Sequence, residues 1–396
     1  MQIEEKGSYR ISFLHLGFRP FFLLSTVFSV AVVACWLWIL SYGGWLATSE
    51  LSVFQWHAHE MLYGYTLAVI AGFLLTAVRN WTGQQTLSGI PLLLLALCWL
   101  AARAMPFIEH PQAMLLMASL DLVFNIGLAI AILLPILKVR QWKHLAIWSK
   151  VVFLLVGNGL FYLGLFNMLD KGIQLGVYTG LYLILSLIML MARRVIPFFI
   201  EKGVDESVSI TNYRWLDLSS LFLMLVFIIV EVFVVMPEWA TIIAATLAVL
   251  HSIRLWGWYA KGIWKKTLIW VLYLGYAWIV VGFILRALAG WSDLNPMLAV
   301  HAFAYGGIGM ITIGMMARVA LGHTGRDVFN PPQGLMIIFI LLFSGSMVRV
   351  LLPILLPDNT STWIFISQLL WIIAFLEFVL TYASMLIKPR IDGKFG

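Results

Sequence analysis

The chain has 396 residues, of which 62% are hydrophobic and only 11% are charged, and its mean hydropathy is +0.97. This composition excludes a soluble domain, whose apolar share is typically about 45–50%. The net charge of +7 and the pI near 9.4 would suit a nucleic-acid-binding protein, but the cations gather in alternate loops between apolar runs. That distribution is typical of membrane topology, so we expect a polytopic membrane protein with the lipid bilayer, and no nucleic acid, as its partner.

Twelve apolar runs reach the length of about 20 residues that one crossing of a bilayer requires. Twenty of the Lys and Arg residues lie on the side of the two termini, against four on the opposite side. The positive-inside rule then places both termini in the cytoplasm. We expect an all-α bundle that forms a single integral membrane domain over 1–396. Its spans are predicted near 20–42, 60–79, 87–107, 113–137, 145–168, 175–198, 215–236, 240–260, 267–289, 297–320, 334–356 and 362–387.

The segment WHAHEM at 56–61 places His57, His59 and Glu60 at the outer start of the second span. Ionisable side chains at the edge of a span are costly, which makes them candidates for a functional site. The alternative is a solvated polar cap. His57 and His59 are two residues apart, so on a regular helix they point about 200° apart and cannot bind one metal together. Either they serve two sites or one of them is a bystander.

His301 begins the tenth span at the same predicted depth as the two histidines of the second. A spacing of eight helices between these spans suggests three pseudo-symmetric units of four helices. In this plan the chain resembles the catalytic subunit of haem-copper oxidases and nitric oxide reductases, although the copper ligands of that superfamily are missing from the sixth and seventh spans. A shift of 242 residues aligns His59, Tyr63, Gly64, Gly72, Thr82 and Gly83 with His301, Tyr305, Gly306, Gly314, Thr324 and Gly325.

An imidazole at a helix start suits axial ligation of haem iron, and a second imidazole from a neighbouring helix completes a low-spin haem. We therefore expect haem axial ligands among His57, His59 and His301; the alternative for each is a hydrogen bond to a neighbouring helix. Three further histidines are candidates for copper or additional haem: His15, His251 and His323.

Charged side chains complete the predicted site. Glu60 and Glu231 lie nearest to its outer side, and we expect them to deliver protons. A structural ion pair, for instance of Arg254 with a carboxylate, is the alternative for such intramembrane charges. Four arginines near the cytoplasmic ends either contact haem propionates or another anion, or only anchor that face: Arg19, Arg79, Arg318 and Arg326.

The segments WHAHEM, GFLLTAVRNWTG and MMARVALGHTGR resemble the NnrS family of bacterial inner-membrane proteins, and with the twelve spans the resemblance covers essentially the whole chain. One departure is Arg79, where a proline before AsnTrp would be usual. The family is associated with haem, copper and nitric oxide metabolism or nitrosative stress during denitrification. The resemblance implies one or two haem b groups, copper as a further cofactor, and an unidentified electron donor.

We therefore expect a multi-pass protein of the bacterial inner membrane that binds nitric oxide at a histidine-ligated haem and reduces or detoxifies it, as a nitric oxide reductase-like oxidoreductase would. One alternative is a non-catalytic haem or copper protein that senses nitric oxide or handles metal. A secondary transporter is a third, supported by the number of spans and by the internal repeat.

Overall fold

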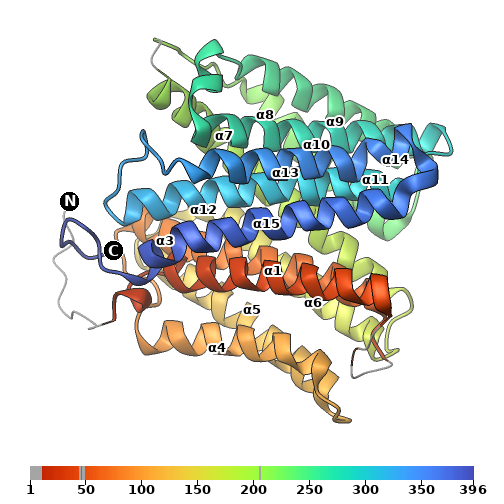
Figure 1. Ribbon diagram of the computed structural model, residues 1–396, viewed down its shortest axis with the longest axis horizontal. Coiled ribbons are helices and arrows are strands. Elements are labelled where there is room, and N and C mark those ends of the chain that lie inside the picture. Colours follow the sequence, from red (N-terminus) through yellow and green to blue (C-terminus); the bar gives the residue numbers. More distant parts are fainter. Residues whose placement is uncertain (1–10, 44–45, 47–49, 205–206) are drawn as a thin grey trace. The chain divides into compact units, whose positions relative to one another are not determined.

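The computed structural model describes residues 11–43, 46, 50–204 and 207–396, and within these ranges every regular element is a helix (Figure 1). Among the described residues, twelve helices are long and apolar enough to cross a membrane. The predicted all-α bundle of twelve spans is therefore confirmed. The helices are α1 (Phe18–Tyr42), α2 (Val53–His59), α3 (Leu67–Thr82), α4 (Ile90–Ala104), α5 (Ala113–Lys138), α6 (Leu145–Leu165), α7 (Gly172–Gly203), α8 (Arg214–Ile228), α9 (Pro237–Gly257), α10 (Thr267–Trp291), α11 (Pro296–His301), α12 (Met310–His323), α13 (Gly334–Val350), α14 (Leu352–Leu355) and α15 (Thr360–Ile387).

The chain divides into two compact units. The first comprises Met1–Gly180, Arg318–Asp327 and Phe375–Gly396, and the second comprises Leu181–Ala317 and Val328–Ala374. The helices α7, α12 and α15 each contribute residues to both units. Neither unit is a set of four consecutive helices, which is the grouping that the spacing of the aligned histidines suggests.

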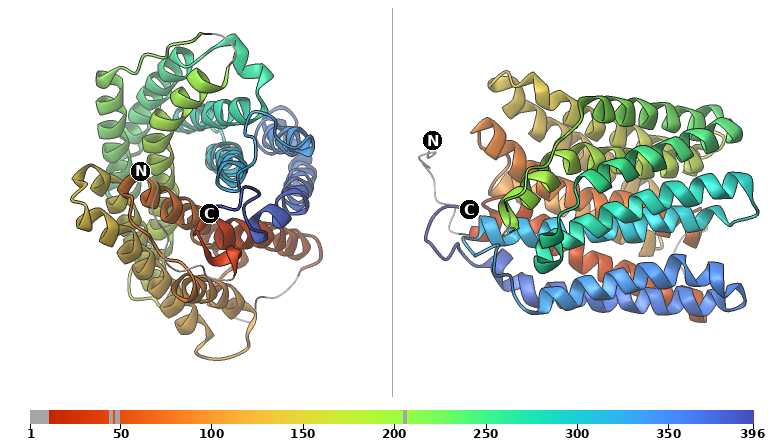
Figure 2. Two further views of the ribbon diagram at one scale, coloured as in Figure 1. Left: turned by 90° about the vertical axis from the view of Figure 1, so that its left-hand side faces the viewer. Right: turned by 90° about the horizontal axis from the view of Figure 1, so that it is seen from above.

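In the first unit, α1 packs along α3, while α5 packs against α3, α4 and α6. The left view of Figure 2 shows these helices nearly end-on, in red to yellow. Large apolar side chains fill the space between them, as where the rings of Phe21 and Phe124 lie 5.8 Å apart. Gly72 allows α1 to approach closely, because a Cβ there would lie 2.9 Å from the Phe22 ring.

In the second unit, α10 packs against α9 and α11, and α8 packs against α9. Its core is aromatic: the ring of Phe283 lies 5.9 Å from that of Phe227 and 4.9 Å from that of Phe303. The core is thus largely apolar, and the buried ionisable side chains described below stand out against it.

The second span begins earlier than predicted. Its first helix starts at Val53 and is capped by Ser52, whose side chain accepts a hydrogen bond of 3.3 Å from the backbone N of Gln55. The Gln55 side chain in turn accepts one of 3.0 Å from the backbone N of Ser52. This capping box starts the helix ahead of the apolar run, so WHAHEM lies within the helix. The helix begins about two turns before the predicted span, because hydropathy passes over polar helical turns.

Both aligned histidines end an α-helical segment and begin a wider, π-helical one. Glu60–Thr66 separates α2 from α3, and Ala302–Gly309 separates α11 from α12. Segments of this kind are rare and occur frequently at functional sites. A third, Ile229–Val234, ends the seventh span.

The aligned residues also play equivalent structural roles. The hydroxyl of Tyr63 donates to the backbone O of Gly176 over 2.7 Å, and that of Tyr305 donates to the backbone O of Ser367 over 2.6 Å. At the far ends of the two spans, Gly83 and Gly325 have φ values of 67° and 78°. This left-handed conformation ends a helix and favours glycine. The repeat in the sequence therefore corresponds to a repeat in structure.

Candidate functional site

The first unit buries a network of ionisable side chains around His59. Its Nδ1 lies 3.0 Å from Glu60 Oε1, and its Nε2 lies 3.0 Å from Asn158 Oδ1 and 3.5 Å from Asp121 Oδ2. Arg103 donates from Nη1 to Glu60 Oε2 over 2.8 Å and from Nη2 to Asp121 Oδ1. All five side chains are buried. Three further spans, through α4, α5 and α6, thus meet the second span at this point.

The network balances its charges. Two carboxylates, Glu60 and Asp121, face one guanidinium, and Tyr162 donates its hydroxyl proton to Asp121 Oδ2 over 2.6 Å. Both ring nitrogens of His59 face oxygen atoms, so a doubly protonated ring satisfies both contacts and makes the group neutral. Such compensation is needed because burying an unpaired charge destabilises the fold by roughly several kcal/mol. While these contacts persist, neither nitrogen of His59 is available to bind iron.

His57 has different surroundings from His59. Its ring stacks on Trp36 of α1, with 4.3 Å between ring centroids and 17° between ring planes. The side chain is half-buried. The two-residue spacing therefore turns one histidine toward α1 and the other toward α6.

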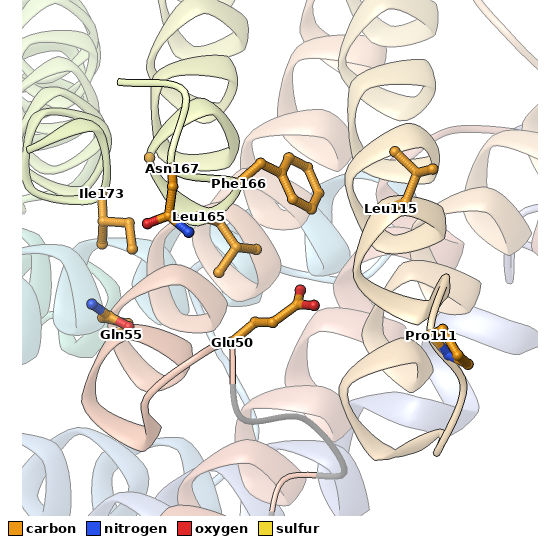
Figure 3. Close-up of a pocket in the computed structure, with 9 residues that line it drawn as sticks. Glu50, Gln55, Pro111, Leu115, Leu165, Phe166, Asn167 and Ile173 are labelled. Carbon is orange, nitrogen blue, oxygen red and sulfur yellow. The ribbon is translucent and has the colours of Figure 1, made fainter. Parts of the chain in front are cut away.

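A surface pocket of about 690 Å³ opens at the same end of the first unit as the network (Figure 3). Its lining includes Glu50, Gln55, Leu115 and Leu165, and Figure 3 shows the Glu50 side chain between the helix ends that carry the two leucines. Gln55, Leu115 and Leu165 precede or follow members of the network by one to two helical turns on the same helices. The network side chains themselves do not line the pocket.

In the second unit, His301 shows a different hydrogen-bonding pattern. Its Nδ1 lies 2.7 Å from the backbone O of Met297, which only accepts, so Nδ1 carries the proton. Its Nε2 lies 2.9 Å from Arg349 Nη2, which only donates. The ring is therefore neutral and has a lone pair on Nε2. A histidine that donates one ring N–H to a backbone carbonyl and keeps a lone pair on the other nitrogen has the arrangement typical of metal ligands.

Glu231 lies in the π-helical end of the seventh span and forms an ion pair within the second unit. Its two carboxylate oxygens accept hydrogen bonds of 2.7 Å and 2.5 Å from Nε and Nη2 of Arg286. The hydroxyl of Tyr182 lies 3.4 Å from the same carboxylate. Both charged side chains are 14% exposed. A two-point contact of this kind fixes orientation as well as charge.

Arg254 forms a structural ion pair with a carboxylate, which was the alternative expected for intramembrane charges. Its Nη2 lies 3.0 Å from Asp217 Oδ1 and also donates to the backbone O of Leu216. Asp217 accepts a second hydrogen bond of 2.6 Å from Arg193. One carboxylate thus joins arginines from α7 and α9.

His251 is fully buried in the second unit, one turn before Arg254. Its Nδ1 lies 2.6 Å from the hydroxyl of Tyr276, and its ring stacks on Phe283 with 5.8 Å between centroids. Its Nε2 has no hydrogen-bond partner. Among the described residues, no group of three or more His, Cys, Asp or Glu side chains is placed to hold a metal ion. Copper binding therefore stays a prediction.

The arginines predicted to contact an anion lie at the other end of the first unit, and Arg19 there caps a helix. Its Nη1 donates to the backbone O atoms of Leu386 and Lys388, each over 2.8 Å, and its Nε donates to that of Gly396 over 2.8 Å. A buried cation that satisfies the last carbonyls of α15 also matches the helix dipole. These donors are occupied by the backbone in this structure.

Arg79, Arg318 and Arg326 belong to the same unit. Arg79 donates from Nε to Gln85 Oε1 over 2.6 Å, and its guanidinium lies 5.2 Å from the ring centroid of Phe395. One nitrogen of Arg326, Nη1, is buried without a hydrogen-bond partner. Arg326 therefore retains a donor that an anion would accept.

Two of the predicted metal-binding histidines also lie here, each against its own neighbours. The ring of His15 stacks on Phe395 with 4.4 Å between centroids. His323 Nε2 lies 3.3 Å from Asn80 Nδ2, and its ring lies 5.6 Å from that of Phe18. Their surroundings are aromatic and cationic, which is not the ligand set of a closed metal site.

The sequence did not identify three arginines that contact the predicted site residues Glu60, Glu231 and His301. Arg103, Arg286 and Arg349 were counted as cations of the outer face, yet each contacts a Glu, an Asp or a His within its own unit. A signal was present: each lies within a span, on the side that is otherwise poor in cations. An arginine in that position indicates an internal partner.

Comparison with known proteins agrees with the sequence motifs. The family model described as NnrS protein matches residues 12–390, which is nearly the whole chain. No curated protein matches the sequence. The chain belongs to the NnrS family, and this membership connects it with nitric oxide-related metabolism.

Proposed function

We propose that the protein binds haem through His301 and that it binds nitric oxide there and reduces or detoxifies it. The observation that carries the proposal is the state of the His301 ring, with Nδ1–H held by Met297 O over 2.7 Å and a lone pair on Nε2. A haem held by His301 would supply iron that can bind a diatomic ligand. Membership of the NnrS family supports nitric oxide as that ligand.

His59, the repeat counterpart of His301, fits haem less well. Both of its ring nitrogens are engaged by side-chain oxygens in a buried ionic network. We propose that His59 anchors this network and that His57, whose ring is half-buried beside Trp36, is the ligand candidate of the second span. Gly64, which follows His59, does not provide space for a cofactor, because a Cβ there would lie 2.8 Å from the Phe28 ring.

The remaining histidines differ in their capacity to bind copper or a second haem. Among His15, His251 and His323, only His251 has a fully buried ring nitrogen with no hydrogen-bond partner. We retain His251 as the copper or additional haem candidate, with its Nδ1 oriented by Tyr276 as second-sphere partners orient metal ligands.

Protons for reduction would be supplied by side chains at the predicted outer ends of the spans. Glu60 belongs to a network that links it to His59 and Arg103. The Glu231 side chain is 14% exposed and forms an ion pair with Arg286. Hydrogen-bonded carboxylates of this kind are suited to relay protons within a membrane.

The structure also sharpens the argument for orientation in a bacterial inner membrane. Of the four cations on the predicted outer side, Arg103, Arg286 and Arg349 contact partners inside their own units. Lys171 is exposed. The asymmetry of loop cations is therefore stronger than the sequence count suggests, which supports cytoplasmic termini.

Purified protein provides the test. We expect bound haem in an optical spectrum, loss of most of it in His301→Ala, and full retention in His110→Ala, which removes an exposed loop histidine. Nitric oxide consumption with an artificial reductant should fall with haem content. Equal haem content in His301→Ala and the wild type would refute the ligand assignment. Bound haem without nitric oxide consumption would favour a non-catalytic sensor.

A further inference from the structure

We propose that Arg349 occupies the Nε2 lone pair of His301 and must release it before His301 can bind iron, so that Arg349 competes with haem for this histidine. The inference rests on the proposed role of His301 as a haem ligand. Arg349 Nη2 lies 2.9 Å from His301 Nε2. Because a guanidinium has donors and no acceptor, the contact uses the same lone pair that a bond to iron would use.

The packing of the second unit holds the two side chains in register. The span that contains His301 contacts α13, which carries Arg349. One turn along each helix, Tyr305 faces Gly345: a Cβ at Gly345 would overlap the Tyr305 hydroxyl. That hydroxyl is fixed by its hydrogen bond of 2.6 Å to Ser367 O. The contact between Arg349 and His301 is therefore set by helix packing rather than by a loose surface encounter.

The exchange of partners requires no proton transfer. The proton of the His301 ring is on Nδ1, where Met297 O accepts it over 2.7 Å. Binding of iron would break one N–H···N hydrogen bond, form one Fe–N bond and leave the charge of the guanidinium unchanged. His59 differs in this respect, since both of its nitrogens face oxygens and a proton would have to leave before either could bind a metal.

The first experiment measures access to His301 in haem-free protein. Diethyl pyrocarbonate attacks unprotonated imidazole nitrogens, and mass spectrometry reports the rate for each histidine. We expect Arg349→Met to raise the rate at His301 about tenfold, which corresponds to about 1.4 kcal/mol. Arg349→Lys, which keeps a donor, should stay near the wild-type rate. The exposed His110 controls for reagent and for folding, since its rate should not change. Equal rates at His301 in all three proteins would overturn the proposal.

The second experiment titrates haem into the same proteins and follows absorbance. Arg349→Met should bind haem about tenfold more tightly than the wild type, and the same change should have no effect in a His301→Ala background. Weaker binding by Arg349→Met would overturn the proposal by showing that Arg349 holds the cofactor instead. If His301→Ala binds haem as the wild type does, the ligand assignment itself fails, whatever the reagent rates show.

Discussion

Replacing Arg103 by Met should destabilise the first unit more than any other single change of an arginine on that unit's helices. The guanidinium bridges Glu60 and Asp121, and all three side chains are at most 4% exposed. Its removal strands two carboxylates, although Tyr162 and His59 still contact them. Breaking a buried pair by removal of one partner costs about 3–5 kcal/mol. We expect a loss of that size in the free energy of unfolding.

Equilibrium unfolding in mixed detergent and dodecyl sulfate micelles, followed by circular dichroism, measures this free energy. Adding Asp121→Asn to Arg103→Met neutralises one stranded carboxylate, so the double variant should be less destabilised than the sum of the single changes by about 2 kcal/mol. Lys138→Met, which removes an exposed cation from the end of α5, should change stability by no more than about 0.5 kcal/mol. Additive effects of the two single changes would refute the network as a coupled unit.

Three further predictions concern a helix end, an ion pair and the C-terminal segment. By the same unfolding measurement, Gly83→Ala should cost about 1–2 kcal/mol because φ is 67° there, whereas Gly159→Ala, in a helix and also with open space around its Cβ, should gain up to about 1 kcal/mol. Glu231→Gln should cost roughly 1–3 kcal/mol, since it leaves a half-buried guanidinium without its anion. The hydrogen bonds from the Arg390 guanidinium hold the pKa of Asp392 below its ordinary value of 3.8. That contact is therefore complete above pH 3.8 and is lost as the pH falls through the lowered pKa. A spin label at Lys394 should be immobile at every pH above 3.8 in the wild type. In Asp392→Asn the same label should be mobile at every pH.

The membrane fold was predictable from sequence because hydropathy reports the length of each apolar run directly. The start of the second helix shows the limit of that signal. Ser52 and Gln55 start the helix by hydrogen bonding, and hydropathy does not register a capping box made of polar residues. The π-helical segments could not be recognised by hydropathy either, since Ala302–Gly309 is as apolar as an ordinary membrane helix whereas Glu60–Thr66 carries polar side chains.

The candidate site was predictable only in part. His59 and His301 look equivalent in the sequence, and they do occupy equivalent positions in their spans. Their partners differ: Asn158 on α6 faces one ring, and Arg349 on α13 faces the other. These partners are not related by the shift that relates the histidines. Which side chain meets a ring nitrogen depends on how neighbouring helices pack, and no local pattern encodes that.

The wide turn after each histidine acts as a one-residue offset in the span. An α-helix advances by about 100° per residue, so an ordinary helix through the same residues Glu60–Thr66 would rotate the preceding turns by about that angle. Glu60 would then take the place of His59 in the network, and an ordinary helix through Ala302–Gly309 would likewise bring Ala302 to the place of His301. The wide turn thus selects the residue that faces the neighbouring helices, and its loss at unchanged length would remove a histidine from its site without substituting it.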